Sequence, residues 1–331
     1  MRMYKNKNKT PVASWYDYDF FTEERRAIKS LTVILRTAGC QWRRCVMCGY
    51  WQESADARLV QADILTQLER ALRDCPEEEF ILKIFTSGSF LDEQEISSDT
   101  RRAIAEMVKR REAVKKLVVE TRPEFVSAEK IESLNGIENL EFAIGLETAN
   151  DFIRSEYIKK GFSFDDYRTA ADTVIGCGAI VKTYLLLKPP FVSEKRAIED
   201  AIKSAELVSD YSSTISLNLC NIQKYTPLEN LWRDGYYRPP LLWSVVDAIT
   251  EIKRRDFVVI SDPVGAGYKR GPHNCGACDN EIKKAIKKFN ITQDLSVFKR
   301  LDELDFACGC KDVWQALIDY DAFLFDSKPF L

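Results

Sequence analysis

The sequence has little of several features that would point to particular protein classes. It contains a single histidine, His273, among 331 residues. No window approaches the ~20 apolar residues that a membrane-spanning helix needs. The amino-terminal segment is polar and lacks the apolar centre of a signal peptide. We therefore expect a cytoplasmic protein with no membrane contact.

The sequence also lacks a large excess of charge of either sign. It has 48 basic and 51 acidic residues and a net charge of −3. The sequence as a whole therefore lacks the excess of positive charge that is typical of nucleic-acid-binding proteins. Basic runs occur at 101–116 and 283–288, where solvated helix faces are the simpler interpretation. Any contact with nucleic acid must therefore come from a local patch or from a partner.

What the sequence does contain is a regular alternation of strand and helix patterns. Apolar, β-branched runs predict strands, and apolar residues at helical spacing predict the helices between them. The predicted strands cover 31–37, 80–90, 115–124, 140–148, 179–190 and 213–220, and the predicted helices cover 62–75, 97–114, 127–134, 164–176 and 193–208. Six strands that alternate with helices predict a parallel sheet, either a barrel or a doubly wound sheet.

Two observations favour the barrel. No GxGxxG motif follows the first strand, which counts against a dinucleotide-binding fold. Unusual residues follow the ends of the first four strands, where a parallel barrel gathers its active site. We therefore predict an α/β fold, a partial (β/α)6 TIM-like barrel over 31–220, with an N-terminal extension at 1–30 and a small cysteine-bearing C-terminal extension at 221–331.

Three of the ten cysteines, Cys40, Cys45 and Cys48, lie on one short loop after the first predicted strand. A structural zinc site needs four ligands, and the only histidine lies far along the sequence. Three thiolates on one loop are what a [4Fe–4S] cluster needs if one iron stays open for an exogenous ligand. The loop also carries polar and basic residues, so burial of the three cysteines as small hydrophobes is the weaker interpretation.

This Cys-x4-Cys-x2-Cys loop resembles that of the radical S-adenosylmethionine (SAM) superfamily. The first gap is four residues where the common pattern has three, and Met47 stands where that pattern has an aromatic residue. The resemblance implies a partial barrel of the radical SAM type. It also implies a [4Fe–4S] cluster on Cys40, Cys45 and Cys48, with SAM as the missing fourth ligand.

Three further segments at strand ends agree with this resemblance. It implies that the small-residue segment of Thr86, Ser87, Gly88 and Ser89 binds the SAM amino group through backbone groups. It implies that Glu120 meets the ribose and Arg122 the carboxylate of SAM. Glu147 lies in a Gly-Leu-Glu-Thr segment that resembles a motif of the elongator-type, tRNA-modifying branch, and it becomes a further candidate for cofactor binding. Taken singly, each segment could instead be an ordinary turn or a surface ion pair.

A closer resemblance, over most of the sequence, is to the radical SAM family of archaeosine biosynthesis. It is carried by residues 32–51, by GPHNCGACDN at 271–280 and by CGC at 308–310. It implies a lyase of tRNA modification that cleaves the C–N bond in the side chain of a lysine attached to a 7-deazaguanine nucleotide, leaving archaeosine. It further implies a lysine-transferring partner subunit, a tRNA that carries the lysine-modified base, and an electron donor.

A second set of cysteines, Cys275, Cys278, Cys308 and Cys310, forms one CxxC and one CxC pair. Brought together, these residues would make a closed, tetrahedral, four-thiolate site. The ligand set suits structural zinc, which we favour, or an auxiliary iron–sulfur cluster. Cys75, Cys177 and Cys220 are isolated, and we assign them no function.

Candidate substrate contacts are polar residues within or just after the later apolar runs: Lys182, Tyr184, Asn218 and Gln223. They would need partners if buried, although they could equally face solvent at strand edges. His273 could replace a cysteine ligand or face the active site.

Two other functions stay open at this point. One is a different radical SAM enzyme of tRNA, of the methylthiotransferase or elongator type, for which the segment after the barrel leaves little room. The other is a zinc-only nucleic-acid-binding protein in which both cysteine sets are structural. The negative net charge and the three-ligand first set argue against it.

Overall fold

The computed structural model describes residues 7–55, 59–73, 75, 77–304, 306 and 308–324. The protein groups into two compact units. Unit 1 comprises Met1–Arg43, Tyr50–Gly145 and Asp165–Lys182, and unit 2 comprises Arg44–Gly49, Leu146–Phe164 and Thr183–Leu331. The cysteine loop at 40–48 contributes to both units, because Cys40 belongs to unit 1 whereas Cys45 and Cys48 belong to unit 2.

The sheet of unit 1 is parallel except at its first strand. Its strands are β1 (Ala13–Phe21), β2 (Arg26–Ile34), β3 (Phe80–Phe85), β4 (Val114–Thr121) and β5 (Leu140–Glu147), of which only the last two residues fall in unit 2. β1 pairs with β2 as an antiparallel hairpin, and β2 to β5 then pair in parallel, each with the next.

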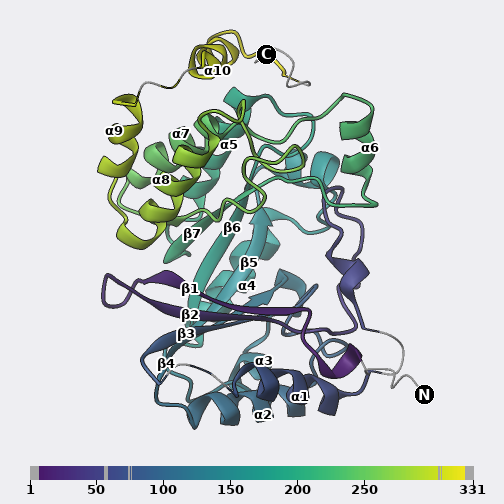
Figure 1. Ribbon diagram of the computed structural model, residues 1–331. Helices are drawn as coiled ribbons and strands as arrows, with labels where there is room; N and C mark the ends of the chain where they lie inside the picture. The colour runs from purple at the N-terminus through teal and green to yellow at the C-terminus, as the bar shows by residue number, and fades with distance from the viewer. Residues whose placement is uncertain are drawn as a thin grey trace, which may run out of the picture. The chain divides into compact units, whose positions relative to one another are not determined.

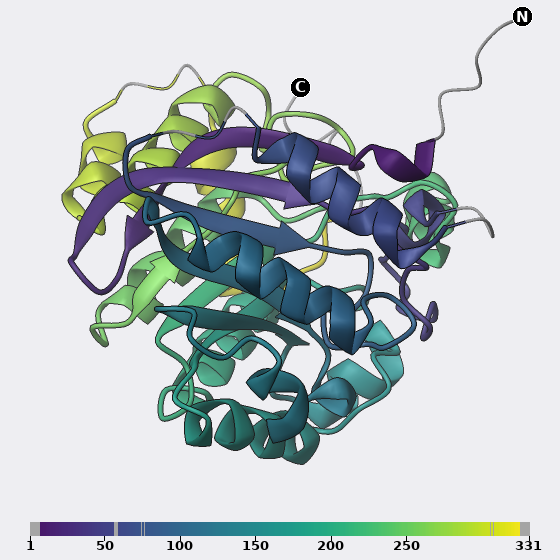
Figure 2. The ribbon, with the colours of Figure 1, turned by 90° about the horizontal axis from the view of Figure 1, so that it is seen from below.

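Helices cover one face of this sheet. They are α1 (Gln61–Ala71), α2 (Ser98–Lys109), the short α3 (Ala128–Glu132) and α4 (Phe164–Gly176), with 3-10 turns η1 (Lys7–Lys9), η2 (Tyr50–Glu53) and η3 (Pro123–Phe125). Figures 1 and 2 show α1 and α2 lying along the face formed by β2, β3 and β4. Alternate strand residues share a face, and one alternate set is entirely apolar and buried: Leu31, Val33, Leu82, Ile84, Leu117, Val119, Phe142 and Ile144. This face packs against the apolar stripes of the helices.

The other face of the sheet carries charges near the amino ends of its strands. Glu141 on β5 lies between two lysines, with its carboxylate oxygens 3.0 Å from Lys116 Nζ and 2.5 Å from Lys182 Nζ. On the neighbouring strands Lys83 pairs with Asp19 at 2.5 Å. Burial by itself would raise the pKa of Glu141, but the charges of Lys182 and Lys116 hold that pKa below its ordinary value.

Unit 2 contains the last strands and most of the later helices. They are η4, a π-helix (Ile153–Ile158), β6 (Ile180–Leu187, whose first three residues fall in unit 1), α5 (Glu194–Leu207), β7 (Thr214–Leu219), α6 (Pro227–Arg233), α7 (Leu242–Lys253), β8 (Val258–Ile260), α8 (Asp279–Thr292), α9 (Ser296–Asp302) and α10 (Cys310–Asp319). β7 and β8 pair in parallel. α7 packs against α5 and α8, and α10 contacts α5 and α7.

The strand order confirms the predicted class of fold. The strands run β1-β2-β3-β4-β5-β6-β7-β8 in one sheet, in the same order as in the sequence. Consecutive order is that of a barrel-type sheet, whereas a doubly wound sheet reverses its order at a switch point. The six predicted strands correspond to β2 through β7. Sequence reasoning missed β1, and the segment predicted as an N-terminal extension contains all of β1 and the start of β2.

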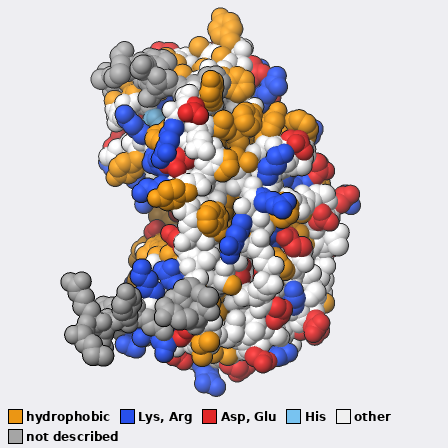
Figure 3. Space-filling model, turned by 90° about the vertical axis from the view of Figure 1, so that its right-hand side faces the viewer, with side chains coloured by type: hydrophobic (Ala, Val, Ile, Leu, Met, Phe, Trp, Pro, Cys, Tyr) orange, Lys and Arg blue, Asp and Glu red, His pale blue; other side chains and the backbone are white. Residues whose placement is uncertain are grey.

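The surface has mixed charge, as the balanced composition predicted. Figure 3 shows Lys and Arg side chains interspersed with Asp and Glu over the face drawn. No helix of the described residues is long and apolar enough to cross a membrane.

The buried charges of unit 1 lead to a first prediction. Glu141→Ala would remove the carboxylate that the buried Lys116 and the half-buried Lys182 share, leaving Lys116 its ion pair with Glu23. We expect the free energy of unfolding to fall by about 3 kcal/mol, the lower end of the range for breaking a buried ion pair. Urea denaturation followed by circular dichroism measures this. The matched control is Glu138→Ala, an exposed glutamate before the same strand, which should change the free energy by less than about 0.5 kcal/mol. Equal effects of the two substitutions would contradict a structural role for the buried ion network.

Candidate cofactor and metal sites

The first half of the cysteine loop is held by its own backbone and by neighbouring loops of unit 1. Gly39 adopts a φ of +79°, which favours glycine, and a Cβ there would collide with the Ser54 side chain. Its N–H donates to Thr37 Oγ1 at 3.2 Å. Arg43 folds back, and its Nε donates to the carbonyl oxygen of Cys40 at 2.8 Å. These contacts leave the Cys40 side chain half-buried at the end of the loop that follows β2.

The second half of the loop is anchored by unit 2. Cys45 and Cys48 form a tight turn in which Cys48 N–H donates to the Cys45 carbonyl at 3.1 Å. Val46, between them, donates to Ile158 O at 2.9 Å and accepts from Leu228 N at 3.1 Å. Met47, where the common pattern has an aromatic residue, packs with Val46 against a buried apolar cluster. Ile158 and Leu228 belong to this cluster, so backbone hydrogen bonds and apolar packing to the same group of residues hold the turn that carries the two half-buried thiols.

Gln223, a candidate substrate residue, also takes part in this anchoring. Its Oε1 accepts the N–H of Gly49 at 2.5 Å, directly after the last cysteine of the loop. The side chain is therefore already engaged in positioning the loop.

The loop at Thr86–Ser89 lies against the first half of the cysteine loop. A Cβ on Gly88 would sit 2.6 Å from Cys40 Cα and 2.9 Å from Cys40 N, and it would also collide with the Glu95 carboxylate. Only glycine allows two backbones to approach so closely. The segment predicted to bind SAM is therefore in direct contact with the first predicted ligand of the cluster.

Glu95, which sequence reasoning missed, ties these two loops together. Its carboxylate accepts the hydroxyl of Thr37 and the backbone N–H of Ser89, each at 2.5 Å. Burial raises the pKa of this carboxyl from 4.5 to about 7, because the hydrogen bonds from Thr37 and Ser89 offset only part of the lost hydration. In the sequence it is one of several acidic residues at 92–95, and no local pattern distinguishes it from the others.

The segment after β4 joins the same arrangement. Thr121 Oγ1 and Ser89 Oγ lie 2.8 Å apart, within hydrogen-bond distance. The guanidinium of Arg122 lies 5.7 Å from the centre of the Trp42 ring in the cysteine loop, and its Nε donates to Glu124 at 2.5 Å. Arg122 is buried, whereas Glu120, near the end of the strand, is half-buried. The predicted cofactor segments at 86–89 and 120–122 and the start of the cysteine loop thus form one contiguous site in unit 1.

Glu147 ends β5 in an unusual conformation. Its φ of +70° is rare for a residue with a side chain and indicates a backbone held by its surroundings. Its carboxylate pairs with Lys160 Nζ at 2.5 Å, and both side chains are nearly buried. A strained, charged residue at the carboxyl end of a strand fits the predicted role near a cofactor.

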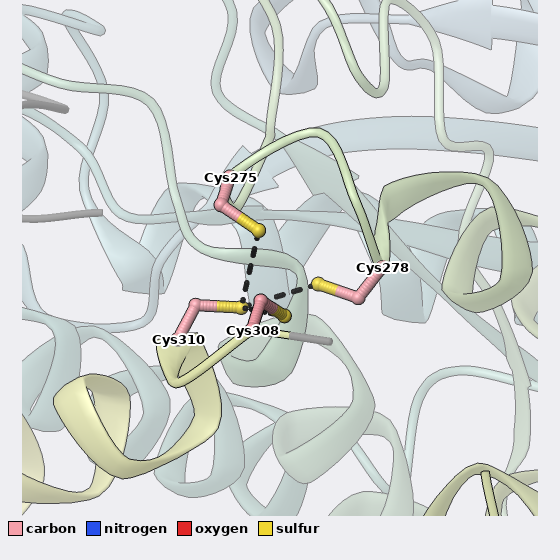
Figure 4. Close-up of side chains that lie close together, drawn as sticks. All are labelled: Cys275, Cys278, Cys308 and Cys310. Carbon is pink, nitrogen blue, oxygen red and sulfur yellow. Dashed lines mark hydrogen bonds between the residues drawn. The ribbon is translucent and has the colours of Figure 1, made fainter. Parts of the chain in front are cut away.

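The second cysteine set converges in unit 2. The Sγ atoms of Cys275, Cys278, Cys308 and Cys310 all lie within 4.8 Å of one another. Figure 4 shows the four side chains pointing toward a common centre: Cys275 and Cys278 come from the segment before α8, Cys308 from the segment before α10 and Cys310 from the first residue of α10. Cys278 and Cys310 are buried, and the other two are half-buried.

The remaining candidates are more scattered. Asn218 accepts a hydrogen bond from Ser216 at 3.2 Å, and Lys182 belongs to the buried ion network of the sheet, near the start of β6. Tyr184 is half-buried on β6.

The ring nitrogen Nδ1 of His273 lies 2.8 Å from the Gly271 carbonyl oxygen, within hydrogen-bond distance. Burial, and to a smaller extent the nearby positive charge of Arg238, lower the pKa of His273. Burial also raises the pKa of the Cys220 thiol to about 12, so it behaves as an apolar side chain.

Comparison with known proteins identifies the family. The model of the radical SAM superfamily matches residues 34–202. The chain belongs to the radical SAM superfamily. The archaeosine synthase subunit beta of Methanosarcina acetivorans is 42% identical to it over 324 residues, which cover 95% of this chain and 92% of the relative. The archaeosine synthase subunit beta of Thermococcus kodakarensis is 42% identical over 302 residues, which cover 88% and 92%.

The solved structure of methylornithine synthase is similar to this radical SAM protein in fold. The TM-score is 0.50 at 14% identity, over 69% of this chain and 63% of that chain. Membership of the superfamily confirms the resemblance first seen in the cysteine loop. The protein is a radical SAM enzyme, so its cofactors are a [4Fe–4S] cluster and SAM, and the zinc-only binding protein is set aside.

The contact between Gly88 and Cys40 leads to a second prediction. Gly88→Ala would push the Thr86–Ser89 loop away from Cys40, and we expect iron incorporation into the reconstituted protein to fall at least roughly five-fold because the first cluster ligand is displaced. Iron and sulfide analysis after anaerobic reconstitution measures this. Gly176→Ala is the matched control, since a Cβ there meets nothing within 4 Å. Full iron loading of Gly88→Ala would contradict the importance of this contact.

The raised pKa of Glu95 leads to a third prediction. The folded protein binds a proton at Glu95 that the unfolded protein releases, so this residue's contribution to stability is lost as pH rises from 4.5 to about 7. The shift corresponds to at most about 3 kcal/mol. In Glu95→Gln this part of the pH dependence should disappear, which urea denaturation at several pH values will reveal. Parallel curves for wild type and variant across this range would refute the assignment.

Proposed function

We propose that this protein is the radical SAM subunit of an archaeosine-forming system. In this role it would cleave the C–N bond in the side chain of a lysine attached to a 7-deazaguanine nucleotide in tRNA. The observation that carries the proposal is the 42% identity, extending over 92% of their length, to two proteins named archaeosine synthase subunit beta. When bound, the cluster and SAM would supply the one-electron chemistry and the hydrogen abstraction that open such a bond.

In this proposal Cys40, Cys45 and Cys48 hold the cluster and leave one iron for SAM. The structure supports this with three half-buried thiols on one loop whose two halves are anchored independently. The donor set of soft thiolates suits iron and sulfide. The turn at Cys45–Cys48 keeps its thiols only half-buried while Val46 and Met47 pack against the apolar cluster.

SAM would lie on the loops after β3 and β4. The N–H groups of Gly88 and Ser89 are already used, by Thr86 Oγ1 at 3.2 Å and by Glu95 at 2.5 Å. In this proposal backbone carbonyl oxygens of the loop would be the acceptors that a SAM ammonium group needs. Glu120 would bind the ribose and Arg122 the carboxylate, while Glu147 remains a further candidate for cofactor binding.

The substrate and partners in this proposal are a tRNA bearing the lysine adduct, a lysine-transferring subunit and an electron donor. The net charge of −3 and the interspersed charges of Figure 3 support a system in which this protein does not bind tRNA on its own. Because phosphate contacts supply most of the affinity of nucleic-acid-binding proteins, the partner subunit would supply much of the affinity for tRNA. Tyr184 and Asn218 remain candidate contacts to the substrate.

A fourth prediction tests the enzyme directly. The reconstituted protein with dithionite and SAM should form 5′-deoxyadenosine, and Cys45→Ala should lower the rate by at least about 100-fold because the cluster loses one of its three ligands. Cys177→Ala, which removes an exposed cysteine outside both sets, should keep the wild-type rate.

Addition of tRNA carrying lysine-modified deazaguanine should then give archaeosine, detected by mass spectrometry of digested nucleosides. Cleavage of SAM without formation of archaeosine, even with the lysine-transferring subunit present, would overturn the proposed substrate while leaving the radical chemistry intact.

A further inference from the structure

We propose that Cys275, Cys278, Cys308 and Cys310 form a closed, four-thiolate site for a single zinc ion that fastens α10 to the rest of unit 2. The site lies outside the radical SAM loop and uses none of its residues. It therefore does not depend on the proposed reaction.

The distances between the sulfur atoms decide between one ion and a cluster. Cys310 Sγ lies 3.6 Å from Cys275 Sγ, 3.2 Å from Cys278 Sγ and 3.3 Å from Cys308 Sγ. Four thiolates around one tetrahedral zinc, with Zn–S bonds of ~2.3 Å, lie ~3.8 Å apart. A [4Fe–4S] core would stand between its four thiolates and hold them on the order of 6 Å apart. With all four sulfur atoms within 4.8 Å of one another, the space suits a single ion.

Three features of the surroundings suit such a centre. Cys278 is the residue directly before α8, and Cys310 is the first residue of α10, so both thiols belong to residues at helix N-termini, where negative charge is favoured. Asn274 Nδ2 donates to Cys278 Sγ at 3.2 Å, a contact of the kind that orients metal ligands. Gly276, between the first two cysteines, has a φ of +95° that a side chain would disfavour, which allows the tight turn of the CxxC pair.

Zinc is the ion that this ligand set selects. Four thiolates leave no open coordination position, which is the pattern of structural rather than catalytic zinc. Zinc also binds thiolate sites more tightly than ferrous iron, so it would prevail where both are present. Cys278 and Cys310 are buried, which closes the site against further ligands.

The proposed centre sits on a buried polar network that continues toward the radical SAM loop. The Arg238 guanidinium donates to the carbonyls of His273 and Asn274, at 2.5 and 3.2 Å. These two residues lie in the loop that carries Cys275 and Cys278. Lys188 Nζ donates to the Arg238 carbonyl at 2.9 Å, and Tyr237 OH donates to the Lys188 carbonyl at 2.7 Å.

Tyr237 belongs to the buried cluster against which Val46 and Met47 pack. The zinc centre would thus stiffen the support beneath Cys45 and Cys48.

On α10, Trp314 Nε1 donates to Ser244 Oγ on α7 at 2.9 Å, a second attachment of the same helix. Because the thiol of Cys310 contacts those of Cys275 and Cys278, zinc bound there would hold the start of α10. Trp314 would hold the middle of the helix. Loss of the metal should therefore loosen the helix most at its N-terminal turn.

The experiment uses the full-length protein with Cys40→Ala, Cys45→Ala and Cys48→Ala, which removes the first site and leaves the second alone. Expressed with both metals available, this variant should contain about one zinc per protein molecule and no iron above background, by elemental analysis. Replacement of Cys308 and Cys310 by alanine in that background should lower the zinc content roughly ten-fold, whereas Cys177→Ala should not change it.

Exchange with cobalt(II) should give the intense visible bands of a tetrahedral four-thiolate site. About four irons with sulfide and a brown colour, or no bound metal at all, would each overturn the proposal.

Hydrogen exchange tests the fastening role on the same variant. Removal of zinc by a chelator should speed amide exchange in Cys310–Asp319 roughly ten-fold or more while leaving α2 unchanged. Unchanged exchange in α10 would refute the clamp, and equally faster exchange in α2 would show general unfolding and refute it as well.

Discussion

The close approach of two backbones, at Gly88 and Cys40, is the constraint on which the cofactor end of unit 1 depends. It requires glycine at one position, and it sets the distance between the loop that follows β2 and the loop that follows β3. Glu95 holds the two loops together by accepting hydrogen bonds from both of them. Burial of a carboxyl group costs free energy, since burial disfavours its charged form. The arrangement still joins the loops well, because one side chain accepts hydrogen bonds from donors in two segments at once.

The second half of the cysteine loop is supported on a different physical basis. Val46 and Met47 pack against an apolar cluster that includes Tyr237. From Tyr237 a series of hydrogen bonds runs through Lys188 and Arg238 to the loop that carries Cys275 and Cys278. Apolar packing resists compression, and the bonded series resists rotation. Together they would hold two thiols with little help from regular secondary structure.

The sheet of unit 1 separates its two kinds of polar chemistry along the strand direction. Near the amino ends, Lys116 and Lys182 share the carboxylate of Glu141, and Lys116 also pairs with Glu23 at 2.6 Å. Near the carboxyl ends lie the loops that we assign to SAM. The length of the strands therefore separates these fixed charges from the loops at the carboxyl ends. This is why Lys182 lies apart from the cofactor loops although its strand belongs to the same barrel-type sheet.

Much of this was predictable from the sequence, because it depends on neighbours along the backbone. Apolar periodicity located β2 through β7 and their helices, and cysteine spacing identified the family and grouped four later cysteines as one site. Tertiary structure alone revealed the roles of Glu95, Gln223 and Lys182, since each depends on a partner that no local pattern names. β1 was missed because its residues are mostly exposed and pair only at the sheet edge. The sequence by itself therefore determined the strands and helices from β2 to β7 and the chemistry of the ligands. Only the folded protein decided which polar side chains position the loops, because hydrogen bonds between distant segments produce no repeating pattern in the sequence.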